Sequence, residues 1–132
     1  MEKGERMSVL GLDIGTSTCK GIVLSCHGVV LAQKQVDYSH AVQVIGEAAE
    51  IDPSYFRDSV VEVVRTLAAE TKEDPISAIS VSSHGETMIP IGQDGKPLMN
   101  AMLSMDRRCE KQVEILKQRE IGRAHRLNSS HR

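Results

Sequence analysis

Hydrophobic residues in the first part of the chain fall into three short runs that are separated by turn-forming residues. Residues 8–14 and 19–25 are rich in Val, Ile and Leu, and residues 29–36 alternate between apolar and polar side chains. The segments between them contain Gly15 and Gly28, and glycine accepts tight-turn conformations without steric cost. Strands joined by such short turns pair in opposite directions. The pattern therefore predicts an antiparallel meander of three strands.

A helical pattern follows a less regular stretch, residues 37–51, which we expect to be a loop with extended parts. Asp52 can cap a helix, and Pro53 suits its first position, where the missing N–H is not needed. We expect the helix to end near residue 71 or 72, ahead of a proline that disfavours helical conformation in the residue before it. Its apolar residues recur at helical spacing and form one stripe, namely Val60, Val63, Val64, Leu67 and Ala68.

The second half of the chain predicts further strands and a second helix. Residues 76–82 are typical of a fourth strand, and residues 86–91 of another, followed by a turn at residues 93–96. Residues 98–103 can form a strand that pairs across that turn with residues 86–91. Residues 106–120 favour a helix, with one face that carries Cys109, Val113 and Leu116.

The last residues, 121–132, do not continue this pattern. Their apolar residues are sparse, and the run that ends in Asn-Ser-Ser-His-Arg resembles translated sequencing-adaptor DNA. We expect this tail to be foreign to the gene and exclude it from the fold, with a native chain terminus as the alternative. The chain is thus divided into a partial domain, residues 1–120, and a non-native tail.

Composition excludes several classes of protein. A net charge of −2 offers no basic face for nucleic acid or for an anionic membrane surface. No run of about 18 apolar residues is present, as a membrane span would need, and no apolar signal-peptide region precedes the first strand. The chain has three cysteines, an odd number, and none of them has Cys-x-x-Cys spacing. We interpret them as reduced thiols that fill core space in a cytoplasmic protein.

The strongest chemical signal lies at the end of the first predicted strand. Asp13 can hold Mg2+ there, directly or through water, and Lys20 can add a compensating positive charge. Gly15 lets the backbone turn close to an anion, and the hydroxyl and N–H groups of the next three residues can bind phosphate oxygens; these are Thr16, Ser17 and Thr18. A plain hairpin is the alternative interpretation, since Gly-Thr-Ser is ordinary turn chemistry. The P-loop pattern is absent.

Residues 10–20, followed by a strand, the turn at Gly28 and another strand, resemble the first phosphate motif of the actin-like ATPase superfamily. The resemblance implies the ribonuclease H-like α/β fold, in which an antiparallel three-strand meander is extended by parallel strands and helices, here incomplete. It also implies ATP and Mg2+ as cofactors. Asp13 would lie near the metal, and the residues around the phosphates would be Gly15, Thr16, Ser17 and Lys20.

Three later segments narrow the resemblance to the FGGY carbohydrate kinases, a family that includes xylulokinases, gluconokinases and glycerol kinases. Residues 46–53 resemble the segment Glu-Gln-Asp-Pro that opens the family's first long helix, with Ile51 in place of Gln. Residues 79–87 are similar to the strand and loop that contact the sugar, although Gly-Glu-Thr matches neither Arg-Glu-Thr of glycerol kinases nor Gln-Met-His of xylulokinases. Residues 103–108 resemble Trp-x-Asp-x-Arg, with Ser104 in place of Trp.

This family resemblance implies sugar contacts from His84, Glu86, Asp106 and Arg108. A carboxylate such as that of Glu86 accepts hydrogen bonds from two adjacent hydroxyls, and histidine donates or accepts according to its tautomer. The alternatives are an exposed loop position for His84 and Glu86, a helix N-cap for Asp106 and a helix-surface charge for Arg108.

The function that the resemblance implies is ATP-dependent phosphorylation of a sugar or polyol hydroxyl by a full-length parent. FGGY kinases carry their catalytic Asp well beyond the length of this chain, so no catalytic base is assigned here, and we expect the chain alone to bind ATP weakly and to transfer no detectable phosphate. Two alternatives stay open: a dehydratase-activator ATPase, which would require iron–sulfur cysteines, and a chaperone-like or regulatory binding module. The substrate and the oligomeric state are also open, with a homodimer of the parent as one option.

Overall fold

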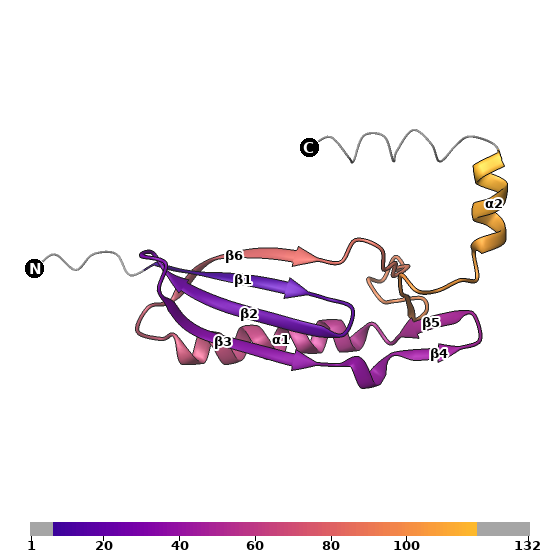
Figure 1. Cartoon of the computed structure of the whole chain (residues 1–132). Helices are drawn as coiled ribbons and strands as arrows, with labels where there is room; N and C mark the ends of the chain where they lie inside the picture. Colours follow the sequence, from indigo (N-terminus) through magenta and orange to yellow (C-terminus); the bar gives the residue numbers. More distant parts are fainter. Residues whose placement is uncertain (1–6, 119–132) are drawn as a thin grey trace, which may run out of the picture.

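The computed structural model describes residues 7–118, which form the coloured ribbon of Figure 1. The elements are, in chain order, β1 (Ser8–Ile14), β2 (Thr18–Ser25), β3 (Val30–Asp37), the 3-10 helix η1 (Ser39–Ala41), β4 (Gln43–Ile45), β5 (Ala48–Ile51), α1 (Ser54–Glu70), β6 (Ile76–Ser83), β7 (Ala101–Met102) and α2 (Glu110–Gln118). The prediction of a non-native tail at residues 121–132 lies outside the described residues.

Four strands form the main sheet, in the order β3-β2-β1-β6. β1 pairs antiparallel with β2, and β2 with β3, so the predicted meander is confirmed. β6 pairs with β1 in parallel, as expected for a later strand. A parallel neighbour requires a crossover connection, and α1 lies within that connection, along the sheet in Figure 1. The predicted mixed α/β class is therefore confirmed.

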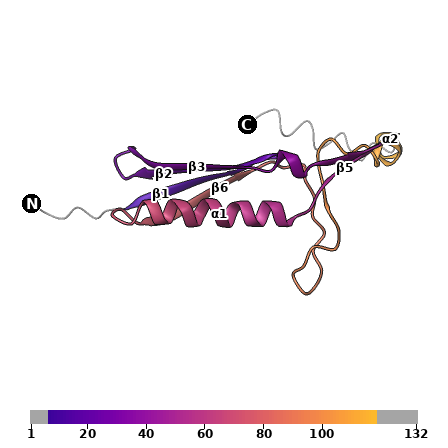
Figure 2. The ribbon, with the colours of Figure 1, turned by 90° about the horizontal axis from the view of Figure 1, so that it is seen from below.

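Helix α1 covers one face of this sheet, as Figure 2 shows. Val63 and Leu67 of the predicted stripe are fully buried, the other two valines of the stripe are half-buried, and Ala68 is exposed. Phe56, which we did not assign to the stripe, is also buried. A Cβ atom added to Gly21 of β2 would lie 2.5 Å from Cγ1 of Val63 and 2.6 Å from Cδ1 of Leu67. Glycine at this position therefore lets the helix approach the sheet closely.

Both ends of α1 follow local chemistry that the sequence indicates. The N–H of Ser54 donates to Oδ1 of Asp52 at 2.8 Å, so Asp52 binds a main-chain donor of the first turn as expected. However, Pro53 and not Asp52 occupies the N-cap position, so α1 begins one residue later than predicted. At the other end, the N–H and Oγ1 of Thr71 both donate to the carbonyl of Leu67, at 3.1 and 2.8 Å. The helix ends where the sequence predicts.

Strand β6 lies at the edge of the sheet and is not covered by α1. Ile79 and Val81 are 54% and 59% exposed, although their register partners Leu10 and Leu12 on β1 are buried. Because paired residues on neighbouring strands share a face of the sheet, these side chains extend the apolar face beyond the part that α1 covers. This side of the sheet leaves room for further packing.

A second sheet replaces part of the predicted loop at residues 37–51. It has the order β4-β5-β7, with β4 and β5 joined by a hairpin turn at Gly46, whose φ is +61°. The third strand comes from a distant part of the chain, because Ile51 pairs with Ala101. The prediction of extended parts was correct, but the partner strand was not foreseen.

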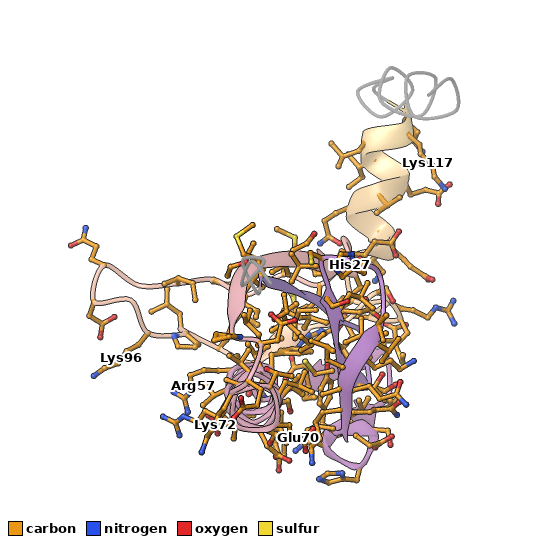
Figure 3. All side chains as sticks on the ribbon, turned by 90° about the vertical axis from the view of Figure 1, so that its left-hand side faces the viewer. His27, Arg57, Glu70, Lys72, Lys96 and Lys117 are labelled. Atoms are coloured by element: carbon orange, nitrogen blue, oxygen red, sulfur yellow. The ribbon has the colours of Figure 1, made fainter. Side chains whose placement is uncertain are left out.

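The predicted strand at residues 86–91 is wrong. Only two isolated bridges occur in this region, Met88 with Met102 and Ile91 with Pro97. The turn at residues 93–96 is confirmed, with Gly95 at φ +77°. Figure 3 shows that the segment carrying Lys96 extends away from the rest of the chain, so it has few neighbours against which a strand could pair.

Helix α2 begins four residues later than predicted and stands away from the main sheet in Figure 1. It begins at Glu110, because residues 108 and 109 form a turn and the N–H of Arg108 donates to Oδ1 of Asp106. Its predicted apolar face, with Val113 and Leu116, is exposed. Within residues 7–118, neither helix combines the length and apolar character that crossing a membrane requires.

The prediction that the cysteines fill core space is correct for one of the three. Cys19, on β2, is fully buried, whereas Cys26 and Cys109 are exposed. All three are free thiols. Burial, together with the charge of Asp13, raises the pKa of the Cys19 thiol. Cys19 therefore stays protonated and acts as a small apolar core residue.

Candidate functional site

A tight turn joins β1 to β2 at residues 15–18, and we refer to it as the Gly15 turn. The N–H of Gly15 donates to the carbonyl of Thr18 at 2.9 Å. A Cβ atom on residue 15 would lie 3.2 Å from that same carbonyl oxygen, which is closer than side chains normally approach. The close approach of the two ends of the turn therefore favours glycine at this position.

The Gly15 turn carries donors that no protein group uses. Within residues 7–118, the main-chain N–H groups of Thr16 and Ser17 donate to no protein acceptor. The hydroxyls of Thr16, Ser17 and Thr18 also make no hydrogen bond in this part of the chain. All three residues are partly exposed. A set of neighbouring N–H and O–H donors at one turn is suited to binding an anion with several oxygens, such as a phosphate.

Asp13 and Lys20 lie directly across from each other on β1 and β2, next to the Gly15 turn. Both side chains are exposed on the face of the sheet opposite α1. Among the described residues neither forms an ion pair or a hydrogen bond. One free carboxylate and one free ammonium group are thus present beside the unused donors of the turn.

A groove of about 710 Å³ lies over this open face of the sheet. Ser82 of β6 is the register partner of Asp13, and Gln35 of β3 is the register partner of Lys20. The sequence analysis did not assign the neutral polar residues of this groove to the site. The period of two along each strand could have identified them, because it puts them on the same face as Asp13. The polar residues of the lining are Asp13, Lys20, Gln33, Lys34, Gln35, Ser80 and Ser82.

Tyr38 and His84 form hydrogen bonds to main-chain carbonyls in the Gly15 turn and directly before it. The hydroxyl of Tyr38 donates to the carbonyl of Gly15 at 2.6 Å, and the main-chain N–H of Tyr38 donates to the carbonyl of Ser17 at 2.8 Å. On the other side, the main-chain N–H and Nδ1 of His84 both lie near the carbonyl oxygen of Ile14, at 3.2 and 2.9 Å. Because a carbonyl only accepts, Nδ1 carries the hydrogen.

The loop after β6 contains two of the predicted sugar contacts, in very different environments. The ring of His84 faces the protein, and its Nε2 is buried without a hydrogen-bond partner. Glu86 is exposed and makes no hydrogen bond or ion pair with the described residues. Oγ1 of Thr87 is buried and also lacks a partner. Of these side chains, Glu86 alone presents a free charged group to solvent.

Asp106 and Arg108 bind each other and the second sheet. Oδ2 of Asp106 accepts hydrogen bonds from Nη2 of Arg108 at 2.7 Å and from the N–H of Ala49 at 3.0 Å. Arg108 also pairs with Glu50 at 2.6 Å, and Glu50 accepts a bond from Asn100. The Arg108 guanidinium, followed by the Ala49 amide, holds the pKa of Asp106 well below its usual range. The same ion pair raises the pKa of Arg108.

Apart from Glu86, which is exposed in the loop after β6, the predicted site residues fall into two groups. Asp13, Lys20 and the Gly15 turn lie together at one end of β1 and β2, with His84 behind them. Asp106 and Arg108 lie in the segment between β7 and α2 and bind Ala49 and Glu50 of β5 in the second sheet. Their predicted contact with a sugar remains a prediction. Within residues 7–118, no group of three His, Cys, Asp or Glu side chains could hold a metal ion by itself.

The sequence model of the FGGY family of carbohydrate kinases, N-terminal domain, matches residues 8–131. A xylulose kinase of Staphylococcus xylosus is 31% identical over 109 residues, which cover 83% of this chain and 22% of that protein. A glycerol kinase of Thermococcus gammatolerans is 32% identical over 116 residues, which cover 86% of this chain and 23% of that protein.

The fold agrees with a solved structure of the same kind. The crystal structure of a gluconate kinase from Lactobacillus acidophilus superposes with a TM-score of 0.76 at 31% identity, over 86% of this chain and 23% of that one. The chain thus spans less than a quarter of the length of each of these relatives.

Proposed function

Because this chain belongs to the FGGY family of carbohydrate kinases, in the part that matches its N-terminal domain, we propose that it supplies the phosphate-binding turn of an enzyme that transfers phosphate from ATP to a sugar or polyol hydroxyl. The relatives named above are kinases of xylulose, glycerol and gluconate. The chemistry that these three substrates share is a hydroxyl on a small polar carbon chain. The proposed acceptor is a hydroxyl of that class.

The observation that carries the proposal is the set of unpaired donors and charged groups at the Gly15 turn and beside it. Phosphoryl transfer depends on positioning and on stabilising charge, so the protein must offer donors and cations where the phosphates lie. Thr16 and Ser17 offer unused main-chain N–H groups, and Lys20 offers an unpaired ammonium. A purely structural hairpin would not need an unpaired carboxylate and ammonium beside a turn of unused donors.

Asp13 is the residue that fits a divalent cation. Its carboxylate is exposed, unpaired and adjacent to the turn, and Mg2+ prefers oxygen ligands. Since one carboxylate is too few for the octahedral shell of Mg2+, the remaining ligands would be phosphate oxygens and water, as is usual for this ion. When bound, Mg2+ would neutralise phosphate charge. In this proposal Asp13 holds the metal and Lys20 balances the charge.

Among the predicted sugar contacts, the geometry supports Glu86 best. Its carboxylate is exposed and free to accept hydrogen bonds from adjacent hydroxyls. Arg108 is 41% exposed and Asp106 only 6%, so Arg108 is better able to reach a ligand. We propose Glu86 as the direct contact and Arg108 as a second sugar contact, which Asp106 holds in place through their ion pair.

The chain by itself is proposed to be inactive. It covers less than a quarter of the relatives named above, and the catalytic base is expected in the part of the parent that follows. Without that part, no second lobe closes over the substrates to exclude water. The parent would act in the cytoplasm, where ATP is plentiful.

The test is an activity assay of the full-length gene product that contains these residues. Mg·ATP would be supplied with a panel of xylulose, glycerol, gluconate and related polyols, and sugar phosphate would be measured. We expect turnover with at least one of them and a large loss of kcat in Asp13→Ala. ATP hydrolysis that no sugar or polyol stimulates would refute the proposal and favour a non-kinase ATPase.

A further inference from the structure

We propose that Tyr38 and His84 are positioning residues, which hold the Gly15 turn from behind and join it to the loop that carries Glu86. The inference rests on the proposed function, in which this turn binds phosphate. It gives His84 a role different from a direct sugar contact, because neither of its ring nitrogens is presented to solvent: Nδ1 bonds to Ile14 and Nε2 is buried.

The contact from Tyr38 fixes the turn at two points. Its hydroxyl donates to Gly15 at 2.6 Å, and its main-chain N–H donates to Ser17 at 2.8 Å. The side chain is 1% exposed, so the hydroxyl cannot exchange this bond for one to water. Burial raises the pKa of Tyr38 to about 12, which keeps the phenol protonated as a donor. Tyr38 thus engages the carbonyls of Gly15 and Ser17, while the N–H groups of Thr16 and Ser17 keep no protein acceptor among the described residues.

The contact from His84 fixes the residue before the turn. Its N–H and Nδ1 converge on the one carbonyl oxygen of Ile14, at 3.2 and 2.9 Å. Glu86 follows two residues later along the chain. A movement of His84 would therefore displace the end of β1 and the proposed sugar loop together.

Phe56 connects the two positioning residues. Its ring centroid lies 5.4 Å from that of Tyr38, edge to face, and 5.7 Å from that of His84. Phe56 is in the first part of α1 and is buried. Tyr38, Phe56 and His84 thus form a continuous row of rings from the end of β3, through α1, to the loop after β6. Packing of this kind holds a binding group in place before its ligand arrives.

The first test measures the turn directly, in the chain of 132 residues. Tyr38→Phe removes one hydroxyl and keeps the ring, and Tyr55→Phe makes the same change at an exposed tyrosine. We expect amide hydrogen exchange at residues 15–18 to be about three- to tenfold faster in Tyr38→Phe, as the loss of one hydrogen bond implies, and unchanged in Tyr55→Phe. Equal exchange in the two variants would overturn the inference.

The second test measures ligand binding by titration of the full-length gene product with Mg·ADP. His84→Leu removes the donor to Ile14, and His84→Asn keeps a donor close to the position of Nδ1. We expect about three- to tenfold weaker binding in His84→Leu and recovery in His84→Asn. Thr71→Val loses a buried hydroxyl bond of similar length at the far end of α1, so it controls for general destabilisation.

The outcomes separate the inference from the proposed function. If His84→Asn binds Mg·ADP as weakly as His84→Leu, or if Thr71→Val weakens binding equally, the positioning role is wrong. If the unmodified protein does not bind Mg·ADP, the proposed function fails. The exchange measurement then still decides whether Tyr38 holds the turn.

Discussion

Arg108 binds Asp106 through two of its nitrogens, with Nε 3.0 Å and Nη2 2.7 Å from Oδ2 of the carboxylate. The Asp106 side chain is only 6% exposed, and the Ala49 amide on the second sheet binds the same oxygen. The pair therefore joins the segment before α2 to strand β5. Its main effect is to hold the second sheet to the chain that follows it.

This contact predicts a loss of stability in acid. The pKa of Asp106 is lowered in the folded state, so its ionised form contributes stability that is fully present above the unfolded value of about 4 and declines as the pH falls below it. Asp106→Asn should lower the midpoint of urea unfolding at about pH 7, and the difference from the unmodified chain should shrink at about pH 2.5.

The control for Asp106 is Asp58→Asn, whose partner Arg57 is an exposed neighbour on α1. This variant should change the midpoint little at either pH, because exposed ion pairs contribute little. An Asp106→Asn difference that is the same at both pH values would contradict the assignment.

A second prediction concerns the contact between α1 and β2. Gly21→Ala should lower the free energy of unfolding by about 1–3 kcal/mol, since the new methyl group would overlap Val63 and Leu67, which are fully buried and cannot move aside freely. Urea unfolding of the chain would measure it. Gly85→Ala is the matched control, because a Cβ there meets nothing within 4 Å. Equal stability of the two variants would show that the helix can shift.

A third prediction concerns alkaline pH. With the pKa of Tyr38 raised to about 12 by burial, ionisation of its phenol should be delayed in the folded chain. Its protonated form contributes stability that is fully present below the unfolded pKa of about 10 and lost as the pH rises towards about 12. Tyrosinate absorbance should show a late phase in the folded chain that is missing in Tyr38→Phe. A late phase that persists in this variant would belong to Tyr55.

A fourth prediction concerns the free charge beside the turn. Lys20→Met should weaken Mg·ADP binding to the full-length gene product by about tenfold or more, because a charged hydrogen bond to phosphate is lost. The difference should narrow at high salt. Lys72→Met removes an exposed ammonium at the far end of α1 and should leave the affinity unchanged. If the two variants bind equally, Lys20 does not face the phosphates.

The parts of the fold that the sequence predicted depend on local patterns. The meander, the hydrogen bond from Ser54 to Asp52 at the start of α1 and the end of α1 each follow from residues that are neighbours in the chain. The second sheet could not be predicted in the same way, because β5 finds its third strand at Ala101, and nothing near Ile51 indicates that partner. Long-range pairing of strands this short has no local signature.

In the candidate site, too, contacts between residues far apart in the chain could not be predicted. The placement of Asp13, Lys20 and Gly15 together at one turn could be predicted, because turn and strand patterns determine which residues lie opposite one another. The position of His84 in a loop was correct, but the direction of its ring depends on Ile14, in another strand. A loop pattern carries no information about such a contact. Its inward orientation therefore became visible only in three dimensions.

The parallel pairing of β6 with β1 has a consequence for synthesis on the ribosome. β1, β2 and β3 leave the exit tunnel consecutively and can form their hairpins at once, whereas Ile76 emerges only after all of α1 has been made. Until then one side of β1 has unpaired main-chain groups in the nascent chain. A pause in translation before residue 76 would prolong that state, in which the growing polypeptide is most open to chaperone capture.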